Sequence, residues 1–103
     1  MPDQLPPDEL AAPTYKARIL VIDDESEIRE SLATLLELEG YNVELAVNAT
    51  DGLRKVEAAS YDLILLDLMM PDRSGMEVLK DLRERGVETP VFMITAYGSV
   101  EVA

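Results

Sequence analysis

Three aspartates, Asp23, Asp24 and Asp67, are the residues whose type and position could carry chemistry in this sequence. Asp23 and Asp24 directly follow the apolar run RILVI, and Asp67 directly follows the apolar run LILL. A carboxylate can attack as an oxygen nucleophile or bind a cation. An aspartate after a strand often only caps the next helix, however. The three aspartates therefore carry chemistry only if the fold brings them together.

Strand-like and helix-like segments alternate along the chain. Strands are predicted over Arg18 to Ile22, Tyr41 to Val47, Leu63 to Leu66 and Val91 to Ile94. Helices are predicted over Ser26 to Glu39, from Asn48 onward with an inner stripe of Ala49, Leu53 and Val56, and from Ser74 to near Gly86 with an inner stripe of Val78, Leu79 and Leu82. The order β-α-β-α-β-α-β predicts an α/β fold with a parallel sheet and helices on both faces.

Helix starts and helix faces support these assignments. Ser74 and Glu77 have the spacing of a capping box, and Asn48 and Asp51 resemble a capping pair. In the first predicted helix, one apolar face is formed by Ile28, Leu32, Leu35 and Leu36. Met69 and Met70, which follow Asp67, are interpreted as packing residues rather than ligands through sulfur.

Polar residues end three of the predicted strands: Asp23 with Asp24, Asp67, and Thr95. The carboxyl ends of parallel strands share one edge of a sheet, so we expect one acidic pocket with a hydroxyl on its rim. Three close carboxylates repel one another unless a cation lies between them. Oxygen ligands without thiol or imidazole suit Mg²⁺ or Mn²⁺. Thr95 taken alone is more often only a β-former at a strand end.

Composition limits the function classes. The chain has 103 residues, enough for one small domain, with 21 acidic and 9 basic residues and a net charge of −12. This charge argues against direct nucleic-acid binding, which needs clustered Lys and Arg. The absence of Cys and His excludes disulfides, thiol catalysis and an internal histidine base. No apolar run reaches the roughly 20 residues of a membrane span, and no signal-peptide pattern opens the chain. We expect a cytoplasmic protein.

Three blocks of sequence resemble the motif blocks of receiver domains from two-component response regulators. They are VIDDE (Val21 to Glu25), LLDLMMPDRSG (Leu65 to Gly75) and ITAYGS (Ile94 to Ser99). The resemblance runs from about Arg18 to the last residue. The last block, together with Met76 to Leu79, is most similar to receivers that precede sigma-54-dependent transcription activators. It implies a flavodoxin-like (CheY-like) fold, doubly wound in three α/β/α layers. It divides the chain into an irregular leader, residues 1–17, and a receiver domain, residues 18–103.

The resemblance also implies roles for the site residues. Asp67 would be the phosphoacceptor, taking a phosphoryl group from a sensor histidine kinase in a phosphorelay that regulates transcription. Asp24 and the Met69 backbone carbonyl would bind Mg²⁺ directly, alongside Asp67, and Asp23 would bind it through water. Thr95 would be the switch hydroxyl. Such a domain is not an enzyme beyond its own phosphorylation and dephosphorylation, and a C-terminal output domain would follow it.

One departure from the family pattern is that the sequence stops at Ala103, before the lysine-bearing fifth strand and the last helix of receivers. Lys55 and Lys80 lie within predicted helices and cannot take that role, and Val100 and Val102 are interpreted as part of an unfinished helix. Without the last strand and helix, the Val91 to Ile94 strand would be a sheet edge. One sheet face would also be uncovered, exposing Leu20, Ile22, Ile64 and Leu66 or their alternating neighbours. A homodimer through this edge or face is therefore expected.

Two other functions remain open on the sequence. Haloacid-dehalogenase-type phosphatases also place a nucleophilic aspartate after an apolar strand, but they need a second aspartate where this chain has Met69. A truncated interaction module that keeps the fold without signalling would fit the missing lysine, although the intact Asp67 argues against it.

Overall fold

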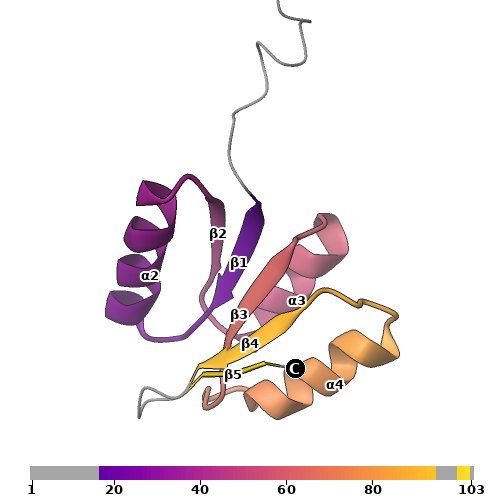
Figure 1. Cartoon of the computed structure of the whole chain (residues 1–103). Helices are drawn as coiled ribbons and strands as arrows, with labels where there is room; N and C mark the ends of the chain where they lie inside the picture. The colour runs from indigo at the N-terminus through magenta and orange to yellow at the C-terminus, as the bar shows by residue number, and fades with distance from the viewer. Residues whose placement is uncertain (1–16, 95–99, 103) are drawn as a thin grey trace, which may run out of the picture.

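A computed structural model of the protein describes residues 17–94 and the backbone of residues 100–102. In chain order the elements are β1 (Arg18–Ile22), α2 (Ser26–Leu38), β2 (Asn42–Ala46), α3 (Ala49–Ala58), β3 (Leu63–Asp67), α4 (Gly75–Glu84), β4 (Val91–Ile94) and β5 (Val100–Val102). The sheet order is β2-β1-β3-β4-β5, as Figure 1 shows. The first four strands are parallel, which confirms the predicted flavodoxin-like α/β fold.

Strand β5 differs from the sequence prediction. Val100 and Val102 belong to a short strand that pairs antiparallel with β4, where the start of a helix was predicted. Three residues of alternating Val-Glu-Val have β-branched side chains at both ends, which favour a strand over a helix. Strand β4 is therefore not an edge of the sheet, and that part of the prediction was wrong.

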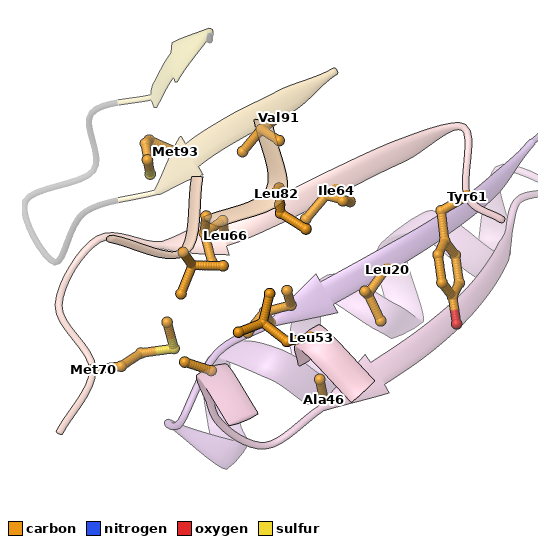
Figure 2. Close-up of a cluster of buried hydrophobic side chains, with 13 residues drawn as sticks. Leu20, Ala46, Leu53, Tyr61, Ile64, Leu66, Met70, Leu82, Val91 and Met93 are labelled. Atoms are coloured by element: carbon orange, nitrogen blue, oxygen red, sulfur yellow. The ribbon is translucent and has the colours of Figure 1, made fainter. Parts of the chain in front are cut away.

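The main hydrophobic core lies between the sheet and the helices α3 and α4. Its buried side chains are Leu20, Ile22, Ala46, Ala49, Leu53, Tyr61, Ile64, Leu66, Met70, Val78, Leu82, Val91 and Met93. Figure 2 shows Leu53 and Leu82 reaching from the helices toward the strands. Leu20, Ile22, Ile64 and Leu66 are completely buried here, so they are not the residues exposed on the opposite face.

The opposite face is covered by α2 over β1 and β2. Its buried residues are Ile19, Val21 and Leu65, and Leu63, Phe92 and Ile94 are among the partly buried residues packed around them. Leu32 and Leu36 of α2 pack against this cluster, but Leu35 is 61% exposed. At about 100° per residue, the buried face of α2 is centred near Leu36, and Leu35 lies on its flank. The predicted apolar face of this helix therefore wrongly included Leu35.

The helix starts follow the predicted capping chemistry. Ser74 accepts a hydrogen bond from the Glu77 N–H, and Glu77 returns one to the Ser74 N–H, which completes the capping box of α4. Asn48 accepts a hydrogen bond from the Asp51 N–H at the start of α3. The Asp51 carboxylate accepts a hydrogen bond from the Val47 N–H, whereas in the capping box of α4 the acidic side chain accepts from the N–H of the cap residue itself. Both helices therefore begin at the carboxyl edge of the sheet, where the predicted site lies.

The edge strand β2 has a lysine beside it. Lys55 of α3 donates a hydrogen bond to the Leu45 carbonyl of β2 and forms an ion pair with Asp51.

No helix in the described part of the chain is long and apolar enough to cross a membrane.

Candidate functional site

The fold brings Asp23, Asp24 and Asp67 together. Strands β1 and β3 are parallel neighbours in register, with Ile22 opposite Leu66, so the residues that end them lie side by side. One carboxylate oxygen from each of the three aspartates lies within 4.8 Å of the others. This is the acidic pocket that the order of strands predicted.

Asp23 is the most buried of the three aspartates and is held from several sides. Its side chain is buried, and its Oδ1 accepts a hydrogen bond from the Glu25 N–H at 2.9 Å. Its own N–H donates to the Ala46 carbonyl at 3.2 Å, which joins the loop after β1 to the end of β2. Arg29 of α2 donates from Nη1 to the Asp23 carbonyl at 2.7 Å. Asp23 is therefore fixed by its backbone as much as by its side chain.

Asp67 lies where an ionised carboxylate is costly. Burial raises its pKa most, and the nearby Asp23 and Asp24 raise it further, to about 7. The Met69 N–H opposes this rise by donating to Asp67 Oδ1 at 3.2 Å. A cation among the three carboxylates would favour the ionised form.

The remaining predicted site residues have different positions. Asp24 is the exposed member of the group of three aspartates. Thr95 lies outside the described residues, directly after Ile94, which pairs in register with Asp67. The Met69 side chain is 70% exposed, so its interpretation as a packing residue was wrong, whereas Met70 is buried in the main core as predicted. Figure 2 shows Met70 on the loop that follows β3.

The loop between β3 and α4 turns back tightly against Asp67. The Gly75 N–H donates to the Leu68 carbonyl at 2.7 Å. A Cβ atom at Gly75 would lie 2.5 Å from the Asp67 carbonyl oxygen and 2.9 Å from the Leu68 Cα, so only glycine fits without backbone movement. The predicted turn at Gly75 thus has a steric cause.

Two residues beside the pocket were missed on the sequence. Arg29 is a cation whose contact with the Asp23 carbonyl has no distinctive spacing in the sequence. Asp72 accepts hydrogen bonds from Ala49 and Thr50, more than 20 positions away, which no local pattern indicates. Both contacts depend on the assembled edge of the sheet.

The donor set of the pocket suits a hard divalent cation. Its side-chain donors are carboxylate oxygens from two buried residues and one exposed residue, which are chemically matched to Mg²⁺ or Mn²⁺. Burial raises the pKa of Asp67 most, and the charges of Asp23 and Asp24 raise it further; a bound cation would relieve this second part. A divalent cation therefore fits the residues present.

This parallel sheet with carboxylates at one edge defines a flavodoxin-like domain, and comparison with known proteins gives its family. The chain matches the response regulator receiver domain family over residues 19–103. It is 49% identical over 79 residues to the transcriptional regulatory protein DltR of Streptococcus agalactiae, a match that covers 77% of this chain and 35% of DltR. The chain therefore spans about a third of the length of this relative.

Solved structures agree with the family match. The response regulator TrrA of Thermotoga maritima, in complex with Mg²⁺ and BeF, has a TM-score of 0.75 and 41% identity, covering 80% of this chain and 71% of that one. TrrA in complex with the histidine kinase ThkA gives a TM-score of 0.75 and 40% identity, covering 82% of this chain and 72% of that one. The chain belongs to the response regulator receiver domain family, which sets aside the phosphatase alternative.

Proposed function

We propose that this domain is the phosphoacceptor of a two-component phosphorelay and that Asp67 takes the phosphoryl group. The observation that carries the proposal is the group of three aspartates, in which Asp67 is the buried carboxylate that ends the central strand β3. The family membership supports it, and so does the relative TrrA, whose structure holds Mg²⁺ and BeF.

In the phosphorelay the phosphoryl group comes from a phosphohistidine of a partner, because this chain has no histidine. An oxygen of the ionised Asp67 carboxylate attacks phosphorus to form an acyl phosphate. The bond from phosphorus to the partner's imidazole nitrogen breaks, and its electron pair leaves on that nitrogen. The Met69 N–H, which donates to Asp67 Oδ1, orients the attacking carboxylate. The domain catalyses nothing beyond its own phosphorylation and dephosphorylation.

Asp24, Asp67 and the Met69 carbonyl would hold Mg²⁺ or Mn²⁺ directly, with Asp23 acting through water. When bound, the cation supplies positive charge that neutralises the phosphoryl oxygens. Asp23 is held by the Glu25 N–H and by the bond from Arg29 to its carbonyl, so it keeps its orientation. Thr95 would be the hydroxyl that turns toward the phosphoryl group.

The partners follow from the same proposal. A sensor histidine kinase supplies the phosphoryl group, as the complex of TrrA with ThkA suggests by analogy. DltR is named as a transcriptional regulatory protein and is longer than this chain, which supports an output domain and a role in transcription. The cytoplasmic location, the sigma-54 subtype and the boundary between residues 17 and 18 stay predictions.

Phosphorylation by a small-molecule donor tests the proposal. Intact-mass analysis after treatment with acetyl phosphate and Mg²⁺ should show one added phosphoryl group, lost when Mg²⁺ is chelated. The matched control is Asp67→Asn, which keeps the size of the side chain and removes the nucleophile. Equal phosphorylation of this variant would refute the assignment of Asp67.

Self-association through the sheet face beside α2 belongs to the proposal as well. Leu63, Phe92 and Ile94 are partly exposed on this face, and a second copy would cover them. Native mass spectrometry should therefore show a dimer that weakens in Phe92→Asp. A stable 11.4 kDa monomer at micromolar concentration would contradict it.

A further inference from the structure

The Asp72 carboxylate joins two parts of the carboxyl edge that are far apart in sequence. It lies in the loop between β3 and α4, two residues before the cap of α4. Its Oδ2 accepts hydrogen bonds from the N–H and the hydroxyl of Thr50, each at 3.1 Å. Its Oδ1 accepts from the Ala49 N–H at 3.3 Å and from the Arg73 N–H at 3.0 Å. One side chain thus receives four hydrogen bonds.

These bonds complete the start of α3. The first N–H groups of a helix have no partner within the helix. Here the Asp51 N–H is bonded to the Asn48 side chain and the Gly52 N–H to the Asn48 carbonyl. The first two N–H groups, those of Ala49 and Thr50, are left for Asp72. Burial would raise the pKa of Asp72, but the hydrogen bonds from Thr50 and Ala49 outweigh it and hold the pKa below its usual value.

The loop that Asp72 holds is also the loop that carries part of the pocket. Met69 lies in it between Asp67 and the buried Met70, with its own side chain mostly exposed. Arg73, the next residue after Asp72, donates from Nη1 to Asp81 of α4 at 2.9 Å. The loop is thus tied at Asp72 to α3 and at Arg73 to α4, while Met69 has no side-chain anchor of its own in the core. The Met69 backbone is held at close range by its own N–H, which donates to Asp67 Oδ1, and by the buried Met70 beside it. The ties at Asp72 and Arg73 hold the rest of the loop that these contacts belong to.

We propose that Asp72 is a positioning residue for the phosphoacceptor site. By fixing the β3–α4 loop to the first turn of α3, it sets the position of the Met69 backbone beside Asp67. This inference rests on the proposed function, since the Met69 carbonyl matters there as a ligand of the cation. It assigns a role in the reaction to a residue that touches none of the three aspartates.

The competing view is that Asp72 is only a second cap that stabilises α3. A cap would contribute stability wherever it stands, so stability alone does not separate the two. Asp62 provides a matched control, because its Oδ2 accepts a hydrogen bond from the Arg18 N–H at 2.8 Å and joins two elements at the amino edge of the sheet. Asp62→Ala removes a comparable bond far from the pocket.

The test compares Asp72→Ala, Asp72→Asn and Asp62→Ala with the unaltered chain. The first measurement is amide hydrogen exchange without metal, read at Ala49, Thr50 and Met69. The second is the affinity for Mg²⁺, measured by NMR titration. Asp72→Asn keeps one acceptor oxygen for Thr50, so it preserves a folded protein if the alanine variant is too unstable.

We expect Asp72→Ala to speed exchange at Ala49 and Thr50 and also at Met69, and to weaken Mg²⁺ binding by about tenfold, as for other residues that support ligands from outside the metal site. Asp72→Asn should lie between it and the unaltered chain. Asp62→Ala should leave both the Met69 exchange and the Mg²⁺ affinity unchanged, even where it lowers the melting temperature.

Faster exchange confined to Ala49 and Thr50, with Met69 and the Mg²⁺ affinity unaffected, would reduce Asp72 to a helix cap and overturn the inference. If the unaltered chain binds no Mg²⁺, the proposed function fails, and the exchange at Met69 without metal still decides whether Asp72 positions the loop.

Discussion

The sheet has an amino edge, where the parallel strands begin, and a carboxyl edge, where they end. The charged residues at these two edges have different neighbours. At the amino edge, Asp62 accepts the Arg18 N–H at 2.8 Å, and the Arg18 guanidinium lies 5.1 Å from the centre of the Tyr61 ring. The Thr89 hydroxyl donates to the Tyr61 carbonyl at 3.3 Å nearby. At the carboxyl edge, three carboxylates instead lie within 4.8 Å of one another. Complementary contacts hold the fold at one edge, and like charges are kept close at the other.

The like charges at the carboxyl edge are the feature that the proposed cation would explain. Repulsion among buried carboxylates lowers stability when no ligand is present, and a bound cation would recover it. Perturbed ionisation of this kind is typical of functional sites. Removal of the Asp67 charge at the carboxyl edge should therefore raise stability in the absence of metal, whereas removal of the Asp62 charge at the amino edge should not.

The largest expected effect is a gain of stability from Asp67→Asn without metal. The pKa of Asp67 is raised by folding from 3.8 to about 7, so between these pH values the native state keeps a proton that the unfolded state has lost. The protonated Asp67 side chain is tolerated by the fold at low pH. As the pH rises from 3.8 to about 7, ionisation of this side chain favours the unfolded state, and the free energy of unfolding falls. At pH 8 the asparagine variant should be more stable by up to about 4 kcal/mol, and at pH 5 by less.

Urea unfolding followed by circular dichroism at pH 5 and pH 8, with a chelator present, measures this gain. Asp62→Asn at the amino edge is the control and should give no gain at either pH. A stability difference for Asp67→Asn that does not change between the two pH values would contradict the raised pKa.

The next effect compares one glycine at each edge. In Gly75→Ala the new methyl group would lie 2.5 Å from the Asp67 carbonyl oxygen, so the backbone must move, at a cost of about 3 kcal/mol. Gly86, after α4, has a φ of +82° with open space around it, so alanine there should cost only about 1 kcal/mol.

Thermal unfolding of the two alanine variants distinguishes these causes, and Mg²⁺ titration adds a second test. Gly75→Ala should also weaken Mg²⁺ binding, because the atoms it displaces belong to the backbone of Asp67 and Leu68, which directly precedes Met69. If both variants lose the same stability and keep their affinity, the close packing at the carboxyl edge has no functional consequence.

The smallest expected effect is the difference in Mg²⁺ affinity between variants of Asp24 and Asp23, two carboxylates at the carboxyl edge. Asp24→Ala should weaken Mg²⁺ binding by about tenfold, roughly 1.4 kcal/mol, and Asp23→Ala by less, because a direct ligand contributes more than one acting through water. Calorimetry is suited to the measurement because the chain has no tryptophan. Unchanged affinity in the Asp24 variant would refute the metal site.

Local patterns in the sequence were enough to predict the parallel strands and the gathering of Asp23, Asp24 and Asp67. Apolar runs mark buried strands, and alternation with helices forces their carboxyl ends to one edge. The capping box of Ser74 and Glu77 was also predictable, because its two residues lie within one helical turn.

Contacts between distant segments could not be predicted in this way. The bonds from Ala49 and Thr50 to Asp72 cross more than 20 residues, and Arg29 reaches the Asp23 carbonyl only after α2 has docked. Strand β5 was missed because three residues carry too little periodicity to separate a strand from a helix. The exposure of Met69 was missed because a tight turn can hold one methionine in solvent beside a buried one.

The hydrogen bond from Lys55 to the Leu45 carbonyl has a consequence for solubility. An open edge strand can serve as a template for ordered aggregation, and a lysine beside it discourages the approach of another chain. Here the lysine belongs to α3, not to β2. The protection that Lys55 gives therefore lasts while α3 stays docked, and partial unfolding of that one helix would leave the Leu45 carbonyl of β2 open to another chain.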